Sequence, residues 1–249
     1  MNISKNTVFI TGGGSGIGLE LARIFVKNGN AVIICGRNKQ KLENAQHSIP
    51  ALKIIECDVS NAEDVERMLE QHGKELQVVN ILVNNAGIMN VYDIQSAETT
   101  LERMELEVST NFLAPLRLIK HFLPILQSKP EAAIVNVTSG VAYVPMAAAP
   151  IYSATKAALH SLSLSLRNQL CSTSVKVFEV LPPLVDTEMP TALQGNGKSM
   201  KKVSPESVAE TILKGLATNE LEMRIGDNNL LYWANRIVPL IAASQLNKM

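Results

Sequence analysis

The chain has 249 residues, 46% of them hydrophobic, which is enough for the buried core of a large α/β domain. Its 23 lysines and arginines balance its 23 aspartates and glutamates, so the zero net charge gives no support to a role in binding nucleic acid or an acidic membrane surface. The three cysteines are widely spaced and do not cluster with the four histidines, which argues against a disulfide framework and a metal site.

The N-terminal residues run directly into a short apolar segment, without the longer apolar region and cleavage site of a signal peptide. No run of about 18 apolar residues occurs, so we expect no membrane-spanning helix. Together with the few cysteines, these observations lead us to expect a cytoplasmic protein.

Short β-rich segments alternate with longer helical patterns along the chain. The expected strands, most of them unbroken apolar runs, are residues 7–11, 31–35, 53–57, 81–84, 133–138, 175–181 and 222–225. The expected helices are residues 16–28, 39–48, 62–72, 99–127 and 151–171. This order predicts an α/β fold with a parallel sheet of about seven strands and helices on both faces, in a single domain over residues 1–249.

Two segments depart from this alternation. Residues 188–204 are polar, contain two glycines and follow a strand, so we predict a lid over the substrate site, with a long surface loop as the alternative. The tail, residues 230–249, is apolar but interrupted by Asn235, Arg236 and Pro239. Three positions are open for this tail: against a neighbouring subunit, over the substrate cleft, or on a membrane surface.

A glycine-rich loop follows the first expected strand and opens the first expected helix. Gly12 permits a tight turn, Gly16 lets a pyrophosphate approach the backbone, and Gly18 lets the helix pack closely on the strand. The helix N-terminus offers free N–H groups to a phosphate. We therefore predict a dinucleotide site, with a ligand-free glycine turn as the alternative. Its predicted residues are Gly12, Gly14, Ser15, Gly16, Ile17 and Gly18.

The end of the second expected strand bears on the choice of cofactor. Gly36 supplies no carboxylate to repel a 2′-phosphate, and the guanidinium of Arg37 is a bidentate donor for one. We therefore predict NADP in preference to NAD. The alternative is that Arg37 is an ordinary surface cation.

A tyrosine and a lysine lie four residues apart at the start of the fifth expected helix. Tyr152 and Lys156 therefore share one helix face, and Ser139 ends the fifth strand at the sheet edge where ligands bind. A lysine ammonium near a phenol favours the phenolate, so we expect the pKa of Tyr152 to lie below its usual value of about 10. Such a tyrosine can donate and accept protons. No Gly-x-Ser-x-Gly motif indicates a serine hydrolase.

These features, taken in order, resemble the short-chain dehydrogenase/reductase family of the single-domain type. The resemblance covers residues 5–226 and implies a Rossmann-type doubly wound fold. The motifs that carry it are Thr11-Gly12-x-x-x-Gly16-x-Gly18, Asp58, Asn84-Asn85-Ala86-Gly87, Asn111, Ser139, Tyr152-x-x-x-Lys156 and Pro182-x-x-Val185-x-Thr187. Three departures are Pro183 in place of a frequent glycine, Ser15 where many NADP-preferring members have a basic residue, and Thr138 in the usual Ser-Ser pair.

The resemblance implies a role for each matched residue. Tyr152 would be the acid/base, Ser139 would stabilise the carbonyl oxygen, Lys156 would bind the nicotinamide ribose and lower the tyrosine pKa, and Asn111 would hold a water in a proton relay. The remaining residues would contact the cofactor: Asp58 and Val59 at the adenine, Asn84 to Gly87 along the wall, and Pro182, Val185 and Thr187 at the nicotinamide. For Asn85 the alternative is a purely structural role. A homodimer or homotetramer through residues 99–127 and 151–171 is also implied.

The leading hypothesis is an NADP(H)-dependent oxidoreductase acting on a carbonyl or secondary alcohol. A non-catalytic NADP(H)-binding sensor and a nucleotide-sugar epimerase are the alternatives. The expected substrate walls are residues 89–97, 140–150 and 188–204. The side chains of Met89, Val141, Val144, Pro145, Met146 and Met189 indicate an apolar substrate pocket.

Overall fold

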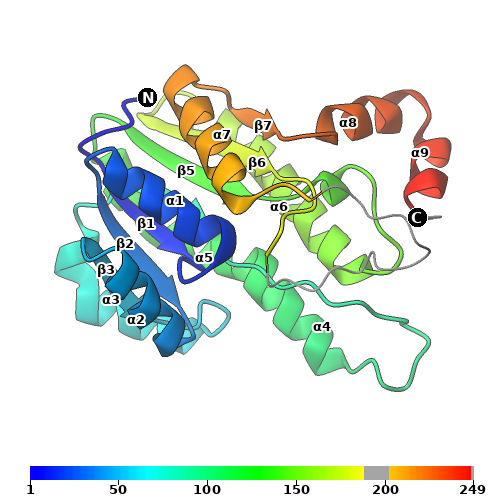
Figure 1. The fold of residues 1–249 in the computed structure, drawn as a ribbon, viewed down its shortest axis with the longest axis horizontal. Helices are drawn as coiled ribbons and strands as arrows, with labels where there is room; N and C mark the ends of the chain where they lie inside the picture. Colours follow the sequence, from blue (N-terminus) through cyan, green and yellow to red (C-terminus); the bar gives the residue numbers. More distant parts are fainter. Residues whose placement is uncertain (188–201, 248–249) are drawn as a thin grey trace.

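The computed structural model describes residues 1–187 and 202–247. A seven-stranded parallel sheet runs through the molecule in the order β3-β2-β1-β4-β5-β6-β7, which confirms the doubly wound α/β fold (Figure 1). The strands are β1 (Thr7–Thr11), β2 (Ala31–Gly36), β3 (Leu52–Glu56), β4 (Ile81–Asn84), β5 (Ala132–Val137), β6 (Val175–Leu181) and β7 (Glu222–Arg224).

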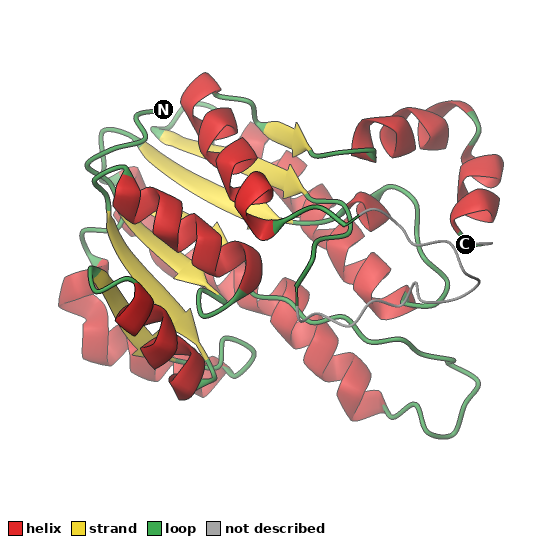
Figure 2. Ribbon diagram, viewed as in Figure 1, coloured by secondary structure: helices red, strands yellow, loops and turns green. Residues whose placement is uncertain are grey.

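Helices cover both faces of the sheet, as Figure 2 shows. One layer contains α1 (Gly16–Lys27), α2 (Lys39–Ser48) and α7 (Pro205–Thr218), and the other contains α3 (Ala62–Leu76), α5 (Ala114–Gln127) and α6 (Pro150–Gln169). Successive strand residues point to opposite faces. Thus Ile10 belongs to the first core and Phe9 to the second, where its ring lies 5.2 Å from that of Phe122.

The strand order indicates where along the sheet a ligand is expected to bind. The chain moves outward from β1 to β2 and β3, and then returns to β4 on the other side of β1. The order therefore reverses between β1 and β4, and ligands of doubly wound folds bind beyond the carboxyl ends of the strands at such a point.

The long helix expected at residues 99–127 is divided. It consists of α4 (Leu101–Val108), a π-helical turn η1 (Ser109–Leu113) and α5. Pro115 has no N–H to donate to the carbonyl of Asn111, which an unbroken α-helix would require. Instead the N–H of Ala114 donates to the carbonyl of Ser109, five residues earlier, and the turn widens.

Three helices near the C-terminus were not expected. Ser204 accepts a hydrogen bond from the N–H of Ser207 and Pro205 follows it, so α7 carries both usual start signals. In the tail, α8 (Asn228–Ile237) ends just before Pro239 and α9 (Pro239–Leu246) begins with it.

Of the predicted lid, residues 188–201 lie outside the described residues. Val203 forms a parallel bridge with Val185.

Among residues 1–187 and 202–247, no helix combines the length and apolar character needed to cross a membrane. Cys35, Cys57 and Cys171 are all free thiols.

Candidate active site

A cavity of about 910 Å³ lies along the carboxyl ends of the strands and extends from the glycine loop to α6. It brings together most of the predicted residues, which come from the loops that follow the first six strands and from the helices α1 and α6. Those that line it are Gly12, Gly14, Ser15, Gly16, Ile17, Arg37, Asp58, Val59, Asn85, Ala86, Gly87, Ser139, Tyr152, Lys156, Pro182, Val185 and Thr187. Gly18, Asn84 and Asn111 lie behind this surface and are buried.

The glycine loop is shaped to admit a ligand against its backbone. Gly12 and Gly16 have positive φ values of 65° and 56°, which L side chains rarely adopt. A Cβ atom at Gly16 would lie 3.0 Å from Cγ2 of Thr187, which also lines the cavity. Within the described residues, the side chain of Ser15 does not cap α1, so the first amides of this helix remain available to an anion. This donor set fits a pyrophosphate.

Asn85 and Gly18 both stabilise the conformation of the glycine loop. The side-chain amide of Asn85 donates to the carbonyl oxygens of Thr11 at 2.9 Å and Gly12 at 3.3 Å. A Cβ atom at Gly18 would lie 2.4 Å from the Gly12 oxygen. The structural role considered for Asn85 is thus visible in its contacts.

The far end of the cavity carries two cations. Arg37 is exposed, and Lys41 lines the same end from the first turn of α2. Asn38 accepts a hydrogen bond of 2.9 Å from the N–H of Lys41 and so fixes the start of this helix. The sequence reasoning missed Lys41, although its position one helical turn beyond Arg37 was a usable signal. Asp58, opposite, accepts hydrogen bonds from the N–H and hydroxyl of Ser60.

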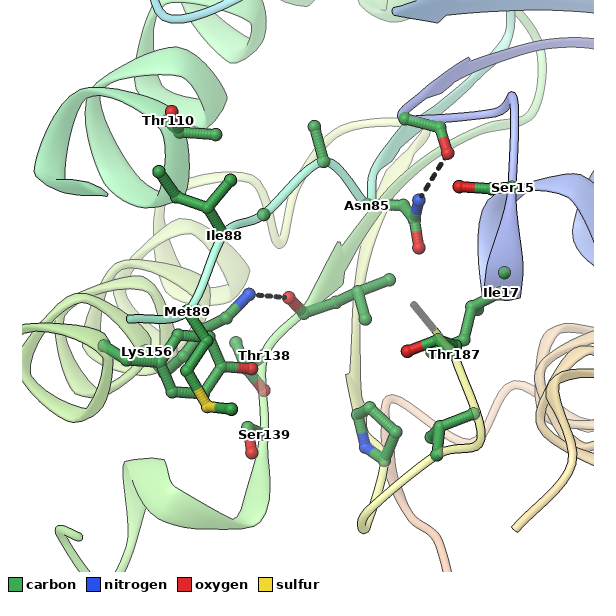
Figure 3. A pocket seen from close by; sticks show the side chains of 18 of the residues that line it. Ser15, Ile17, Asn85, Ile88, Met89, Thr110, Thr138, Ser139, Lys156 and Thr187 are labelled. Carbon is green, nitrogen blue, oxygen red and sulfur yellow. Dashed lines mark hydrogen bonds between the residues drawn. The ribbon is translucent and has the colours of Figure 1, made fainter. Parts of the chain in front are cut away.

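Tyr152 and Lys156 occupy adjacent turns of α6 and line the cavity. Figure 3 shows Lys156 on the side of the cavity opposite Ser15 and Ile17. The ammonium of Lys156 donates to the carbonyl oxygen of Val137 and lies 5.5 Å from the Tyr152 ring centre. Burial lowers the pKa of Lys156 to about 8. The predicted lowering of the Tyr152 pKa is wrong: burial raises this pKa to about 12, although a hydrogen bond with Ser139 acts in the opposite direction.

Asn111 lies in η1 and connects three parts of the site. Its side-chain oxygen accepts from the N–H of Ile88 at 2.9 Å, and its amide donates to the Ile88 carbonyl at 2.8 Å. The same amide lies 3.2 Å from the hydroxyl of Thr155, next to Lys156. Asn111 therefore joins the loop after β4 to α6.

The substrate end of the cavity is mostly apolar. Met89, Val141 and Met146 line it as expected, whereas Val144 is buried beneath it, Pro145 is exposed, and Met189 is outside the described residues. The unexpected lining residues include Thr110, Asn228, Leu231 and Leu246.

The end of α9 is anchored beside this wall. The side-chain oxygen of Asn247 accepts from the N–H of Ala147 at 2.6 Å, and its amide donates to the Pro145 carbonyl. Leu246 packs against a buried cluster that contains Met89 and Tyr152. Sequence patterns gave no signal for this contact, because it joins segments that are far apart in the chain.

Comparisons with known proteins identify the family of this chain. The model of the short chain dehydrogenase family matches residues 6–196. The oxidoreductase DltE of Bacillus subtilis (strain 168) is 44% identical over 224 residues, which cover 90% of this chain and 89% of that protein. A short chain dehydrogenase from Burkholderia cenocepacia J2315, solved in complex with NADP, has a TM-score of 0.85 at 25% identity and covers 99% of both chains.

A second solved structure, a short chain dehydrogenase/reductase from Burkholderia phymatum in complex with NAD, shares the fold with a TM-score of 0.84 at 20% identity; the match covers 100% of this chain and 98% of that one. The fold and the cavity define an NAD(P)-binding oxidoreductase of the Rossmann type. The chain belongs to the short-chain dehydrogenase family.

Proposed function

We propose that the protein is an NADP(H)-dependent reductase of apolar ketones or aldehydes, with Tyr152 as the proton donor. The observation that carries this proposal is the placement of Ser139, Tyr152 and Lys156 in the same cavity as the glycine loop. Bound nicotinamide supplies the hydride chemistry. The residues of this chain position the carbonyl and manage the proton.

Tyr152 is suited to the reductive direction. With a pKa of about 12 it holds its proton at neutral pH and can donate it to the carbonyl oxygen as that oxygen gains negative charge. The O–H bond of the phenol breaks as the new alcohol O–H bond forms, and the phenolate then recovers a proton that originates in solvent. Ser139 lines the same cavity as Tyr152 and is placed to donate to the same oxygen.

Lys156 and Asn111 support this proton transfer. With a pKa of about 8, Lys156 is mostly cationic at neutral pH and stabilises a phenolate one helical turn away. It is also the candidate donor to the nicotinamide ribose. Asn111 fixes the Ile88 backbone and contacts Thr155, which supports the proposed relay towards Lys156.

The preference for NADP rests on the end of β2. Gly36 places no carboxylate there, and Arg37 and Lys41 both line the cavity, so a 2′-phosphate at this end would lie near two cations. Solved relatives include a complex with NADP and one with NAD, which support either dinucleotide. The two cations favour the phosphorylated one.

We also propose that the protein forms a homo-oligomer and that it is located in the cytoplasm. Large apolar side chains are exposed on the neighbouring helices α4, α5 and α6, among them Leu101, Leu106, Leu116 and Leu164, and these support a subunit contact there. The buried free thiols of Cys35 and Cys57 suit a reducing compartment.

The decisive test follows the absorbance of NADPH and of NADH, separately, with apolar ketones, aldehydes, diketones and quinones. We expect NADPH turnover that Tyr152→Phe loses and Tyr232→Phe keeps, because Tyr232 lies outside the cavity lining. Retained turnover in Tyr152→Phe would refute the proton donor. NADPH binding without turnover on any substrate would favour a sensor instead.

A further inference from the structure

Glu107 is a buried carboxylate that the proposed chemistry does not use. It lies on α4, four residues before Asn111, and its exposure is 0%. It does not line the cavity, but Thr110, three residues later, does. A carboxylate is rarely buried to this extent unless its partners compensate for the lost hydration.

The hydrogen-bond partners of Glu107 all come from one short segment. The hydroxyl of Tyr92 lies 2.6 Å from Oε2. The backbone N–H of Asn90 lies 3.4 Å from Oε1, and its side-chain amide lies 3.3 Å from Oε2. This segment forms part of the cavity wall through Ile88, Met89 and Asn90. Glu107 therefore holds the wall from behind.

Two elements place charged or titratable groups near this carboxylate. On α4, the guanidinium of Arg103 lies 5.6 Å from the centre of the Tyr92 ring, whose hydroxyl bonds to Glu107. Helix α4 packs against α6, and the negative charge of Glu107 raises the pKa of both Lys156 and Tyr152 on that helix. For Lys156 this influence opposes the effect of burial.

We propose that Glu107 is a positioning residue of the active site, which fixes the 88–92 wall through Asn90 and Tyr92 and places a negative charge on the side of α4 that faces the helix of Lys156. This inference rests on the proposed function for its catalytic meaning. The contacts themselves involve only residues of this chain, so they can be tested without turnover.

The first experiment measures Lys156 directly. Protein labelled with carbon-13 at the lysine Cε atoms is titrated by NMR, and the Lys156 signal is assigned by its absence in Lys156→Met. In Glu107→Gln, which keeps the shape and removes the charge, we expect the midpoint to move to lower pH by at least about 0.5 unit. An unchanged midpoint in a folded variant would overturn the charge role.

The second experiment tests the contacts of Glu107 with the 88–92 wall separately from the effect of its charge. Tyr92→Phe keeps the Glu107 charge but loses its shortest hydrogen bond, and Glu107→Asp keeps the charge but shortens the reach to Asn90. For both we expect an unchanged Lys156 midpoint and a KM for the carbonyl substrate raised about threefold or more, with a smaller change in kcat. An unchanged KM in both would overturn the wall role.

The failure modes are distinguishable. If wild-type protein shows no turnover, the proposed function fails, yet the Lys156 titration still tests the charge of Glu107. If Glu107→Gln does not fold, the KM comparison of Tyr92→Phe and Glu107→Asp still tests the wall. Circular dichroism of every variant establishes which case applies.

Discussion

The ammonium of Lys156 donates a hydrogen bond of 2.8 Å to the carbonyl oxygen of Val137, the last residue of β5. This bond keeps the lysine against the sheet edge, where its side chain is 3% exposed. The cost of burying the charge lowers the pKa of Lys156 from 10.5 to about 8.

Because of Lys156, the stability of the protein should change with pH in the alkaline range. Because its folded pKa lies below its unfolded value, the unfolded chain binds more protons between these values, and the free energy of unfolding should rise as the pH increases through that window. In Lys156→Met this rise should be smaller. Denaturant unfolding at about pH 7 and about pH 9.5 measures it; parallel curves for the two proteins would contradict the prediction.

His160 should make the stability of the protein fall as the pH rises, whereas Lys156 should make it increase. Its Nδ1 lies 2.9 Å from the fully buried carboxylate of Glu179, and this hydrogen bond raises the pKa of the histidine above 6.5. The stabilisation should be complete below pH 6.5 and be lost as the pH rises through the folded pKa. Melting curves across this window should show that His160→Gln loses this dependence and that His72→Gln keeps it.

Replacing two helical glycines, Gly18 and Gly73, by alanine should change the free energy of unfolding in opposite directions. At Gly18 a Cβ atom would clash with the Gly12 oxygen, so Gly18→Ala should lower the free energy of unfolding by about 1–3 kcal/mol. At Gly73 in α3 no described atom lies within 4 Å, so Gly73→Ala should raise it by about 0.5–1 kcal/mol through helix propensity. Urea unfolding of the pair measures both, and equal signs would show that the loop can adjust.

Arg37 should contribute to the choice between the two dinucleotides. Arg37→Ala removes a charged donor from the cavity end and should raise the KM for NADPH about 10- to 100-fold, with little effect on NADH. Lys39→Ala is the matched control, because this nearby exposed cation does not line the cavity. Equal losses for NADPH and NADH would assign Arg37 a general role.

The sequence allowed the sheet and most of the cofactor end to be predicted, because both depend on local patterns. Short β-rich segments, most of them unbroken apolar runs, identified all seven strands, and the spacing of Gly12, Gly16 and Gly18 located the loop after β1. These features require only neighbouring residues and the rule that parallel strands share one functional edge.

The remaining features depend on contacts between distant segments. Leu246 meets the cluster around Tyr152 only after the whole sheet has formed. The rise in the pKa of Tyr152 reflects burial, which spacing within one helix does not reveal. Likewise, Glu107 appears in the sequence as one of several acidic residues on α4, and its complete burial depends on Asn90 and Tyr92.

The π-helical turn at Ser109–Leu113 has a consequence for how this chain can vary in length during evolution. A π-helical turn holds about one residue more than an α-helical turn, so deleting one of these five residues would give a continuous α-helix and leave the orientation of α4 relative to α5 nearly unchanged. A single deletion within α5 would instead rotate α4 by about 100° relative to the rest of α5 and turn Glu107 away from Asn90. Descendants of this gene should therefore accept the loss of one residue within the turn more readily than within α5.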